Sequence, residues 1–434
     1  MEIGYSKHVL GNGLDVLIHE DRGAPIVAVN LWYHVGSKNE QPGRTGFAHL
    51  FEHLMFEGSV HYDRSYFQPL QRAGGVLNGS TNADRTNYWE VVPTGALELA
   101  LWMESDRMGH LLPALTEAKF QNQRDVVLNE RRQNYENRPY GLAPMALLAS
   151  LFPRDHPYSW PTIGSAEDLR AARLDGVRDF FQRYYHPANA SLALAGDVDP
   201  DAVLPLIERY FGGIPPGPRV EPLSLDAALA SEVRVVLEDA VELPRLYLAW
   251  HSPAIFTACD AEMDLVAEAL GETKASRLYR RLVFEDRIAT DVSAVQQSRE
   301  LSGFFQIVAT AAPGHGLEEL DAAVQREVAR LASEGPSVEE LERGLAQAEA
   351  QFIFRLQTVG GFGGKSDQLN QYNVFVGDPG FLQRDLERYR ATTVDRVREA
   401  AARVLAGSTR VAISVVPRGR AELALPGSVV GVFS

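Results

Sequence analysis

The stretch LDGVR at residues 174–178 is echoed by VDRVR at residues 394–398. Each stretch opens a predicted helix that leads into an apolar strand, at residues 192–195 in the first case and 411–416 in the second. A helix followed by a strand at the end of each half of a chain indicates a duplicated domain. The echo therefore predicts two domains of related structure.

The length of the chain and one proline-rich stretch agree with this division. A chain of 434 residues is long enough for two domains of about 200 residues, each with its own core. The sequence IPPGP at residues 214–218 is typical of a linker. We predict an N-terminal domain at residues 1–215, a linker at 216–230 and a C-terminal domain at 231–434.

Local patterns predict an α+β fold. Residues 26–33 are β-branched and aromatic, as in a strand, and residues 45–57 have apolar side chains at helical spacing and stop at Gly58. A further strand is predicted at residues 76–81 and a long helix at 117–136. Polar alternation in several strands favours largely antiparallel sheets, each with helices packed on one side.

Composition excludes several classes of protein. With 45% hydrophobic and 23% charged residues and no apolar run of about 18 residues, the chain is not expected to cross a membrane. The net charge is -15 and basic residues do not cluster, which argues against nucleic acid as a partner. Cys259 is the only cysteine, so an internal disulfide framework is excluded. The first residues do not resemble a secretory signal, so we expect a cytoplasmic protein, or a periplasmic one if a signal had been removed.

The predicted helix at residues 45–57 carries His49, Glu52 and His53. Residues four apart share a helix face, so the two histidines can bind one ion. Zinc accepts imidazole nitrogen and keeps a position open for water when three protein ligands hold it. Glu52 reaches the same side, where it can act as general base and later return the proton to the leaving amine. The order His-x-x-Glu-His is the inverzincin motif, although two solvated or core-capping histidines would leave the same pattern.

Together with this motif, several stretches resemble the pitrilysin family, which includes insulin-degrading enzyme and the mitochondrial processing peptidases. These stretches are GGVLNGST at residues 74–81, DRTNY at 84–88, VVLNERR at 126–132 and the loop at 157–164. The resemblance implies that Glu130, 77 positions after His53, is the third ligand of one zinc ion per chain. It also implies a clam-like half-shell of two duplicated domains, in which the N-terminal domain is catalytic and the C-terminal domain is not.

The resemblance extends to groups around the metal. Family members commonly have a second glutamate two turns before the ligand glutamate, and Gln123 occupies that position here. An amide can orient a ligand through a hydrogen bond but adds no charge. In relatives the strand at residues 76–81 is an open edge that pairs with extended substrate, which makes substrate contacts of Val76, Leu77, Asn78, Gly79 and Ser80. A simple hairpin is the other interpretation of this strand.

The C-terminal half departs from the family pattern. Self-sufficient relatives place an arginine and a tyrosine seven residues apart there, to bind substrate and polarise its carbonyl, and this chain has Val283 and Thr290 at those positions. We therefore expect the zinc-bearing subunit of a heterodimer whose homologous partner carries the Arg/Tyr pair. Two alternatives stay open: a homodimer, and a shifted alignment in which Tyr279 acts with Arg280, Arg281 or Arg287.

The sequence thus predicts a zinc metalloendopeptidase that hydrolyses oligopeptides or unfolded segments. The alternative is a non-catalytic core or peptide-binding subunit of the same family, since some relatives have become structural subunits. The glycine-rich stretch at residues 360–365 lacks the spacing of a phosphate-binding loop and is interpreted as a flexible turn or a substrate-contacting loop.

Overall fold

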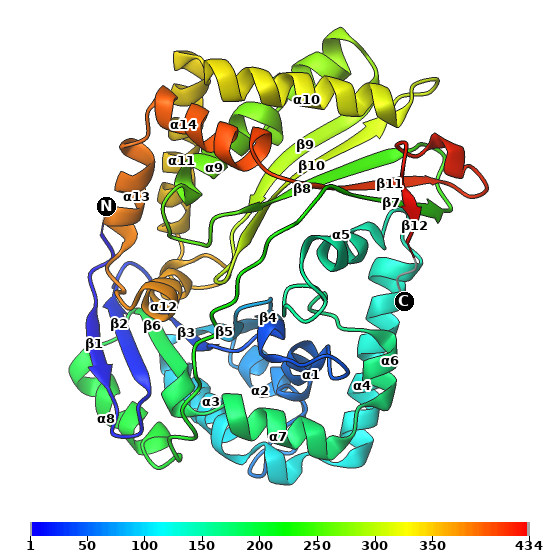
Figure 1. The fold of residues 1–434 in the computed structure, drawn as a ribbon. Helices are drawn as coiled ribbons and strands as arrows, with labels where there is room; N and C mark the ends of the chain where they lie inside the picture. Colours follow the sequence, from blue (N-terminus) through cyan, green and yellow to red (C-terminus); the bar gives the residue numbers. More distant parts are fainter. Residues whose placement is uncertain (1, 432–434) are drawn as a thin grey trace. The chain divides into compact units, whose positions relative to one another are not determined.

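The computed structural model describes residues 2–431 and contains two six-stranded sheets, one in each of two compact units (Figure 1). The first unit comprises Met1–Asn129, Thr162–Pro222 and Gln351–Asp385, and the second comprises Glu130–Pro161, Leu223–Ala350 and Leu386–Ser434. The α+β fold with two sheets is confirmed. The units are not contiguous in sequence, and in this they differ from the division at residues 215 and 231.

The first unit is built on the sheet β1-β2-β6-β3-β5-β4. Its strands are β1 (Ser6–Val9), β2 (Asp15–Glu20), β3 (Ile26–Tyr33), β4 (Val76–Thr81), β5 (Thr86–Pro93) and β6 (Ala190–Gly196). Its helices are α1 (Phe47–Leu54), α2 (Phe67–Arg72), α3 (Leu97–His110), α6 (Ala166–Ala171), α7 (Leu174–Tyr184), α8 (Pro200–Phe211) and α12 (Lys365–Val376).

The second unit is built on the sheet β12-β7-β11-β8-β10-β9. Its strands are β7 (Val233–Asp239), β8 (Arg245–Ser252), β9 (Ala289–Gln297), β10 (Gly303–Ala311), β11 (Val411–Pro417) and β12 (Val429–Val430). Its helices are α5 (Ala143–Leu151), α9 (Asp260–Ala267), α10 (Leu317–Glu334) and α14 (Val394–Ala401). Three helices continue across the division between the units: α4 (Glu117–Arg131), α11 (Val338–Arg355) and α13 (Leu382–Arg390).

Five strands of each sheet share one topology, which confirms the duplication predicted from the sequence echo, whereas the sixth strands differ: β1 is antiparallel to β2, and β12 is parallel to β7. In each unit the strand that follows the echoed helix enters the sheet between two earlier strands. β6 is parallel to β2 and antiparallel to β3, and β11 is parallel to β7 and antiparallel to β8. The helices that open with the echoed stretches are α7 and α14.

Most helices cover one face of each sheet, but each sheet also carries a helix on the second face. In the first unit, α3 packs against β3 and β5, whereas α12 packs against β6, β3 and β2. Successive side chains of β3 point to opposite faces of the sheet, so helices are needed on both faces to bury them. The ring of Tyr33 packs against Tyr88 and Tyr185 on one face, and Asn30 and Trp32 donate to a side chain of α12 on the other. A strand buried on both faces is rich in apolar residues throughout, as IVAVNLWY is in β3.

The second unit repeats this arrangement with a helix from the other half of the sequence. Figure 1 shows α10 on one side of the sheet and α5 on the other, and α5 packs against β11 and β8. Each unit therefore obtains its second-face helix from the opposite half of the chain: α12 in the first and α5 in the second. This exchange is the reason that the compact units are not contiguous.

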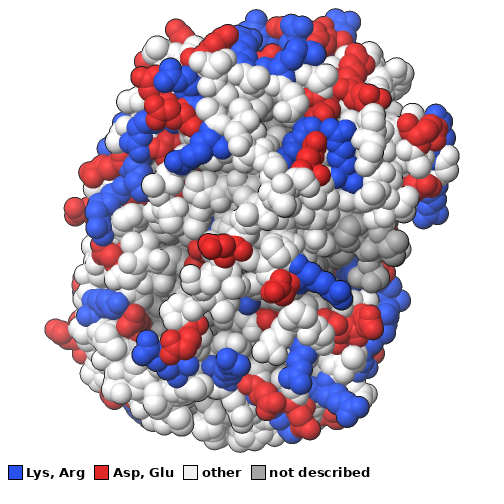
Figure 2. Space-filling model, viewed as in Figure 1, with Lys and Arg blue, Asp and Glu red and all other residues white. Residues whose placement is uncertain are grey.

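On the face shown in Figure 2, acidic and basic side chains are interspersed. Among residues 2–431, no helix is both long enough and apolar enough to cross a bilayer.

A carboxyl group in α9 should make the stability of the second unit depend on pH. Burial, and then the charge of Asp260, raise the pKa of Asp264 to about 7, while the Tyr389 hydroxyl donates to its carboxylate. The folded state holds this proton more tightly than the unfolded state. Protonation of Asp264 therefore adds its full amount to the free energy of unfolding below about pH 4, and this added stability is lost as the pH rises through about 7. The loss is at most about 4 kcal/mol.

We expect Asp264→Asn, which cannot ionise, to remove most of this decrease in the free energy of unfolding between pH 5 and pH 8. Urea unfolding at several pH values measures it. Asp395→Asn, which replaces an exposed carboxylate of α14 in the same unit, is the matched control and should leave the pH slope unchanged. An equally steep decrease in Asp264→Asn would contradict this assignment.

Candidate metal centre

The N-terminus of α1 is fixed by a glycine and a carboxylate. Gly46 has a φ of 90°, and a Cβ there would meet the Ile163 carbonyl oxygen and a Leu169 methyl at 2.9 Å. The Glu40 carboxylate accepts hydrogen bonds from the backbone N–H groups of Gly46 and Ala48, at 2.9 and 2.8 Å, and so caps the helix. The direction in which α1 leaves the preceding loop is thereby determined.

The predicted start of this helix at Thr45 was two residues too early. Thr45 lies outside α1, and its hydroxyl donates to Asp168 at 2.6 Å and accepts from the Ser165 N–H at 2.9 Å. Those bonds hold the residue in the loop, and the left-handed conformation of Gly46 separates it from the helix.

The apolar face of α1 orients the polar face that carries the motif. Phe47, Leu50, Phe51 and Leu54 are buried, and the ring of Phe51 stacks on Phe181 with centroids 5.1 Å apart. His49, Glu52 and His53 are only half-buried. Packing of the apolar stripe therefore sets the rotation of the helix and directs the three polar side chains to one side.

The structure brings His49 and His53 together with Glu130 of α4. One ligand atom from each residue lies within 4.8 Å of the others, and the two imidazole rings are edge to face with centroids 4.8 Å apart. Glu130 follows Asn129 within the uninterrupted helix α4, inside which the division between the units falls. Two imidazole nitrogens and a carboxylate at this spacing form a donor set that zinc accepts, with a further coordination position left for a small ligand.

Burial favours the metal-binding form of one of these histidines. Burial, and to a smaller extent the nearby His53, lower the pKa of His49 to about 3. The imidazole is therefore neutral near pH 7, and its nitrogen lone pair is available to a cation.

The charge of Glu52 acts on three side chains of the first unit. Burial raises the pKa of Tyr88 and of Tyr185, and the negative charge of Glu52 adds to both increases. Burial lowers the pKa of Arg85, and the charges of Asp367 and Glu52 oppose that decrease. Glu52 is thus close enough to interact electrostatically with two neutral phenols and with a buried guanidinium.

The predicted substrate strand and Gln123, both singled out from the sequence, lie on β4 and α4. β4 is an edge strand of its sheet, as predicted, and it packs against α1. Val76 is exposed, whereas a Cβ on Gly79 would lie 3.0 to 3.1 Å from Tyr88 and Phe56, which favours glycine there. The side chain of Gln123 donates to Glu57 and not to any of the three candidate ligands. Its role in orienting a ligand stays a prediction.

A polar cluster that sequence reasoning missed supports β5 next to this edge. Asp367 of α12 accepts hydrogen bonds from Asn30, Trp32 and Asn87, at 3.2, 2.8 and 3.2 Å, and from the Gly363 N–H at 2.7 Å. Gly360, in the glycine-rich stretch before α12, is closely packed, since a Cβ there would overlap β3 and β5.

The same cluster reaches the edge strand through Arg85. Its guanidinium donates to the Ser80 carbonyl at 2.8 Å and to Asn87 at 3.0 Å, while the Ser80 hydroxyl donates to Asn87 at 2.7 Å. Asp367 thus fixes Asn87, and Asn87 and Arg85 fix the strand that carries Ser80. Asp367 is 280 residues from Asn87 in the sequence, so no local pattern could have indicated the contact.

The second unit repeats the cap of α1 but not its chemistry. α9 begins after Cys259, whose φ of 74° corresponds to that of Gly46. Counted from these caps, the positions of His49, Glu52 and His53 are occupied by Glu262, Leu265 and Val266. The duplicated helix therefore has no imidazole at either histidine position and no carboxylate at the position of Glu52.

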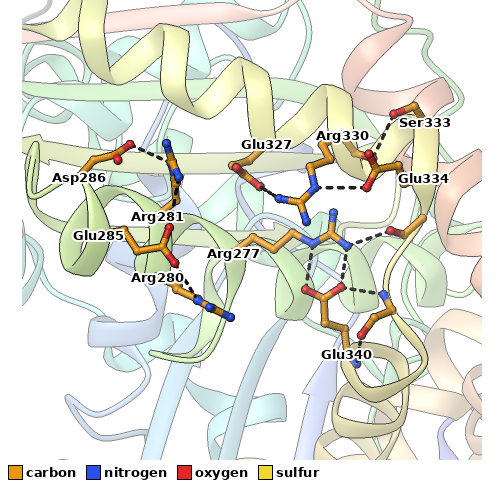
Figure 3. A network of polar contacts seen from close by, with 12 residues as sticks. Arg277, Arg280, Arg281, Glu285, Asp286, Glu327, Arg330, Ser333, Glu334 and Glu340 are labelled. Atoms are coloured by element: carbon orange, nitrogen blue, oxygen red, sulfur yellow. Dashed lines mark hydrogen bonds and ion pairs between the residues drawn. The ribbon is translucent and has the colours of Figure 1, made fainter.

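The structure also locates Val283 and Thr290. Val283 packs against the apolar core of the second unit from the π-helical segment Tyr279–Glu285, and Thr290 is an exposed residue of β9. Two candidates of the shifted alignment pair with carboxylates: Arg280 with Glu285, and Arg281 with Glu285 and Asp286 (Figure 3).

Figure 3 also shows that the neighbouring Arg277 is bound in a separate set of contacts. It pairs with both oxygens of Glu340 and donates to the Gly335 carbonyl. Gly335 directly follows α10 and Glu340 lies in the first turn of α11, so Arg277 holds these two helix ends together. Its role in the second unit is therefore structural.

Comparison with known proteins also distinguishes the N-terminal part of this chain from its C-terminal part. Residues 15–164 match the family model described as Insulinase (Peptidase family M16), and residues 172–348 match Peptidase M16 inactive domain. The zinc protease PqqE of Helicobacter pylori is 29% identical over 80% of this chain and 79% of its own. The uncharacterized zinc protease YmxG of Bacillus subtilis is 22% identical over 90% of this chain and 93% of its own.

Solved structures show the same fold. The crystal structure of a protease from Helicobacter pylori superimposes with a TM-score of 0.87 at 25% identity, covering 95% of this chain and all of that one. The peptidase M16 inactive domain from Pseudomonas fluorescens has a TM-score of 0.85 at 19% identity, over 95% of this chain and 98% of that one. With two family models matched in order along the sequence and the whole fold shared, this chain belongs to the M16, or insulinase, family of peptidases, as its resemblance to the pitrilysin group implied.

Proposed function

We propose that this protein is a zinc endopeptidase whose metal ligands are His49, His53 and Glu130. The observation that carries the proposal is the meeting of their donor atoms within 4.8 Å on two helices, one of which, α1, also carries Glu52. The matched relatives named zinc proteases support the choice of metal. Three protein ligands are typical of a catalytic zinc site, whereas structural sites usually have four.

Each residue has a separate task in hydrolysis. A zinc ion held by the three ligands would supply a Lewis acid that activates water and polarises the scissile carbonyl. Glu52 accepts a proton from the attacking water and then delivers it to the leaving amine. The neutral state of His49 keeps a lone pair available for the metal over the physiological pH range.

The edge strand supplies a place for extended substrate. A peptide that adds to β4 as a further strand would use its own backbone groups to pair with those of Val76 to Ser80. Such pairing depends little on substrate sequence, which suits oligopeptides and unfolded segments. The contacts from Arg85 and Asn87 to Ser80 hold the edge in place.

We further propose that full activity requires a homologous partner subunit with an Arg/Tyr pair. Val283 and Thr290 offer neither a guanidinium nor a phenol, and Arg280 and Arg281 already pair with carboxylates of their own segment. A missing donor to the developing oxyanion costs a factor on the order of 10²–10³ in rate.

Hydrolysis of a quenched fluorescent peptide tests both parts of the proposal. The chain alone should be slow, a partner with the Arg/Tyr pair should increase the rate by about 10²–10³, and a chelator should abolish it. His53→Ala should lose both activity and the tightly bound zinc. Full activity as a homodimer would contradict the partner requirement only, whereas chelator-resistant hydrolysis would contradict the zinc peptidase. Failure to cleave with any partner would favour the non-catalytic subunit.

A further inference from the structure

A second group of metal-binding side chains lies in the first unit, outside the set described above. His61, Asp106 and His110 each offer one donor atom, and these atoms lie within 4.8 Å of one another. We propose that the three residues form a second binding site for Zn²⁺ or a similar divalent transition metal. The site joins the loop after α1 to the end of α3.

The backbone brings the three residues together independently of any metal. Asp106 and His110 are four apart in the last turns of α3 and so share one face of that helix. The N–H of Val60 donates to the His110 carbonyl at 3.1 Å, which places the next residue, His61, beside the helix end. The loop is further fixed at Gly58, whose φ is 91° and whose added Cβ would lie 2.7 Å from the backbone of Arg64.

Asp106 is held in one orientation at the base of this group. Its side chain is 4% exposed, one carboxylate oxygen accepts from the Ser59 hydroxyl, and the other contacts Nδ1 of His61. The rings of His61 and His110 stand edge to face with centroids 4.8 Å apart. The side chain of His61 is 55% exposed, so an ion can enter from solvent and the ring can turn toward it.

The donor set determines the class of ion. Two imidazoles and one carboxylate suit Zn²⁺, Co²⁺, Ni²⁺ and Cu²⁺, whereas Ca²⁺ and Mg²⁺ prefer oxygen ligands throughout. Zinc bonds of about 2.0–2.2 Å in tetrahedral geometry need donors closer than 4.8 Å, and rotation of the two exposed rings can close that gap. Since the site exists only in the folded chain, metal binding stabilises the native state and ties the loop after α1 to α3.

Cobalt titration of the full-length chain tests the proposal. In a His49→Ala/His53→Ala background, which disables the first site, we expect about one equivalent of Co²⁺ to bind with visible d–d absorption and to raise the melting temperature. His61→Ala and His110→Ala should each remove the absorption and the shift. His315→Ala is the matched control, because His315 also pairs with a carboxylate, Glu319, but belongs to no cluster of three donors among the described residues.

Hydrogen exchange gives a second readout that does not depend on catalysis. Zn²⁺ should slow exchange of the Val60 amide in the parent chain and not in His110→Ala, because the metal holds the segment that carries this hydrogen bond. Unchanged Co²⁺ binding in both alanine variants, or no Co²⁺ binding by the His49→Ala/His53→Ala chain, would overturn the second site. Either result would leave the peptidase proposal intact, because that proposal rests on other residues.

Discussion

Replacement of Glu52 by glutamine is expected to lower peptide hydrolysis by a factor on the order of 10²–10⁴ while the chain keeps its zinc. Glutamine has the shape of glutamate, and Glu52 is half-buried on the polar face of α1, so the helix should fold unchanged. The amide cannot accept the proton of the attacking water. Turnover of a fluorogenic peptide and the zinc content of the same preparation give the two measurements.

The control for this experiment lies on the other helix of the candidate centre. Glu117→Gln changes an exposed glutamate in the first turn of α4, far along that helix from Glu130, and should hydrolyse peptide at the wild-type rate. If Glu52→Gln retains zinc and also keeps the wild-type rate, Glu52 is not the general base.

The substitution Arg107→Met is expected to destabilise the first unit by about 3–5 kcal/mol. Arg107 is 1% exposed, and its guanidinium lies between the rings of Tyr66 and Tyr88, 4.0 and 4.1 Å from their centroids. It donates to the Glu104 carboxylate, which is fully buried. Methionine would fill much of the space but would leave that carboxylate in the interior without its cation.

Denaturant unfolding measures this loss, and a double variant isolates its cause. Glu104→Leu/Arg107→Met removes both charges together and should recover most of the stability, because two apolar side chains tolerate burial. If the double variant is as unstable as Arg107→Met, the loss comes from packing against Tyr66 and Tyr88 and not from the uncompensated charge.

The sequence could predict those parts of the site whose signals are local. The spacing of His49, Glu52 and His53 specifies one face of one helix, and β4 has the predicted bounds Val76–Thr81. The separation of His53 and Glu130 in the sequence identified Glu130 as a third ligand only through a family resemblance, because spacing along a chain does not determine which helices meet. The structure supplies that missing step by bringing their donor atoms together.

The sequence could not predict the contacts that depend on distant segments. Nothing in the sequence singled out Asp367, which binds three side chains of β3 and β5 from the first turn of α12. The glycine-rich stretch before it was interpreted as a flexible turn or a substrate-contacting loop, and no local pattern indicated that β3 and β5 leave no space for a Cβ at Gly360. Both features come from packing between residues more than 250 positions apart, which periodicity over a short window cannot detect.

The exchange of α5 and α12 between the two halves has a consequence for biosynthesis. During translation, the first sheet cannot acquire its second-face helix until residues 365–376 have left the ribosome, close to the end of the chain. Until then, the apolar residues of β3 and β6 that α12 covers remain exposed to water and to other nascent chains. Contacts this remote in sequence also slow folding, since a long loop must close before they form. The first sheet thus stays without this helix while most of the second half of the chain is made, which gives chaperones a long opportunity to act on it.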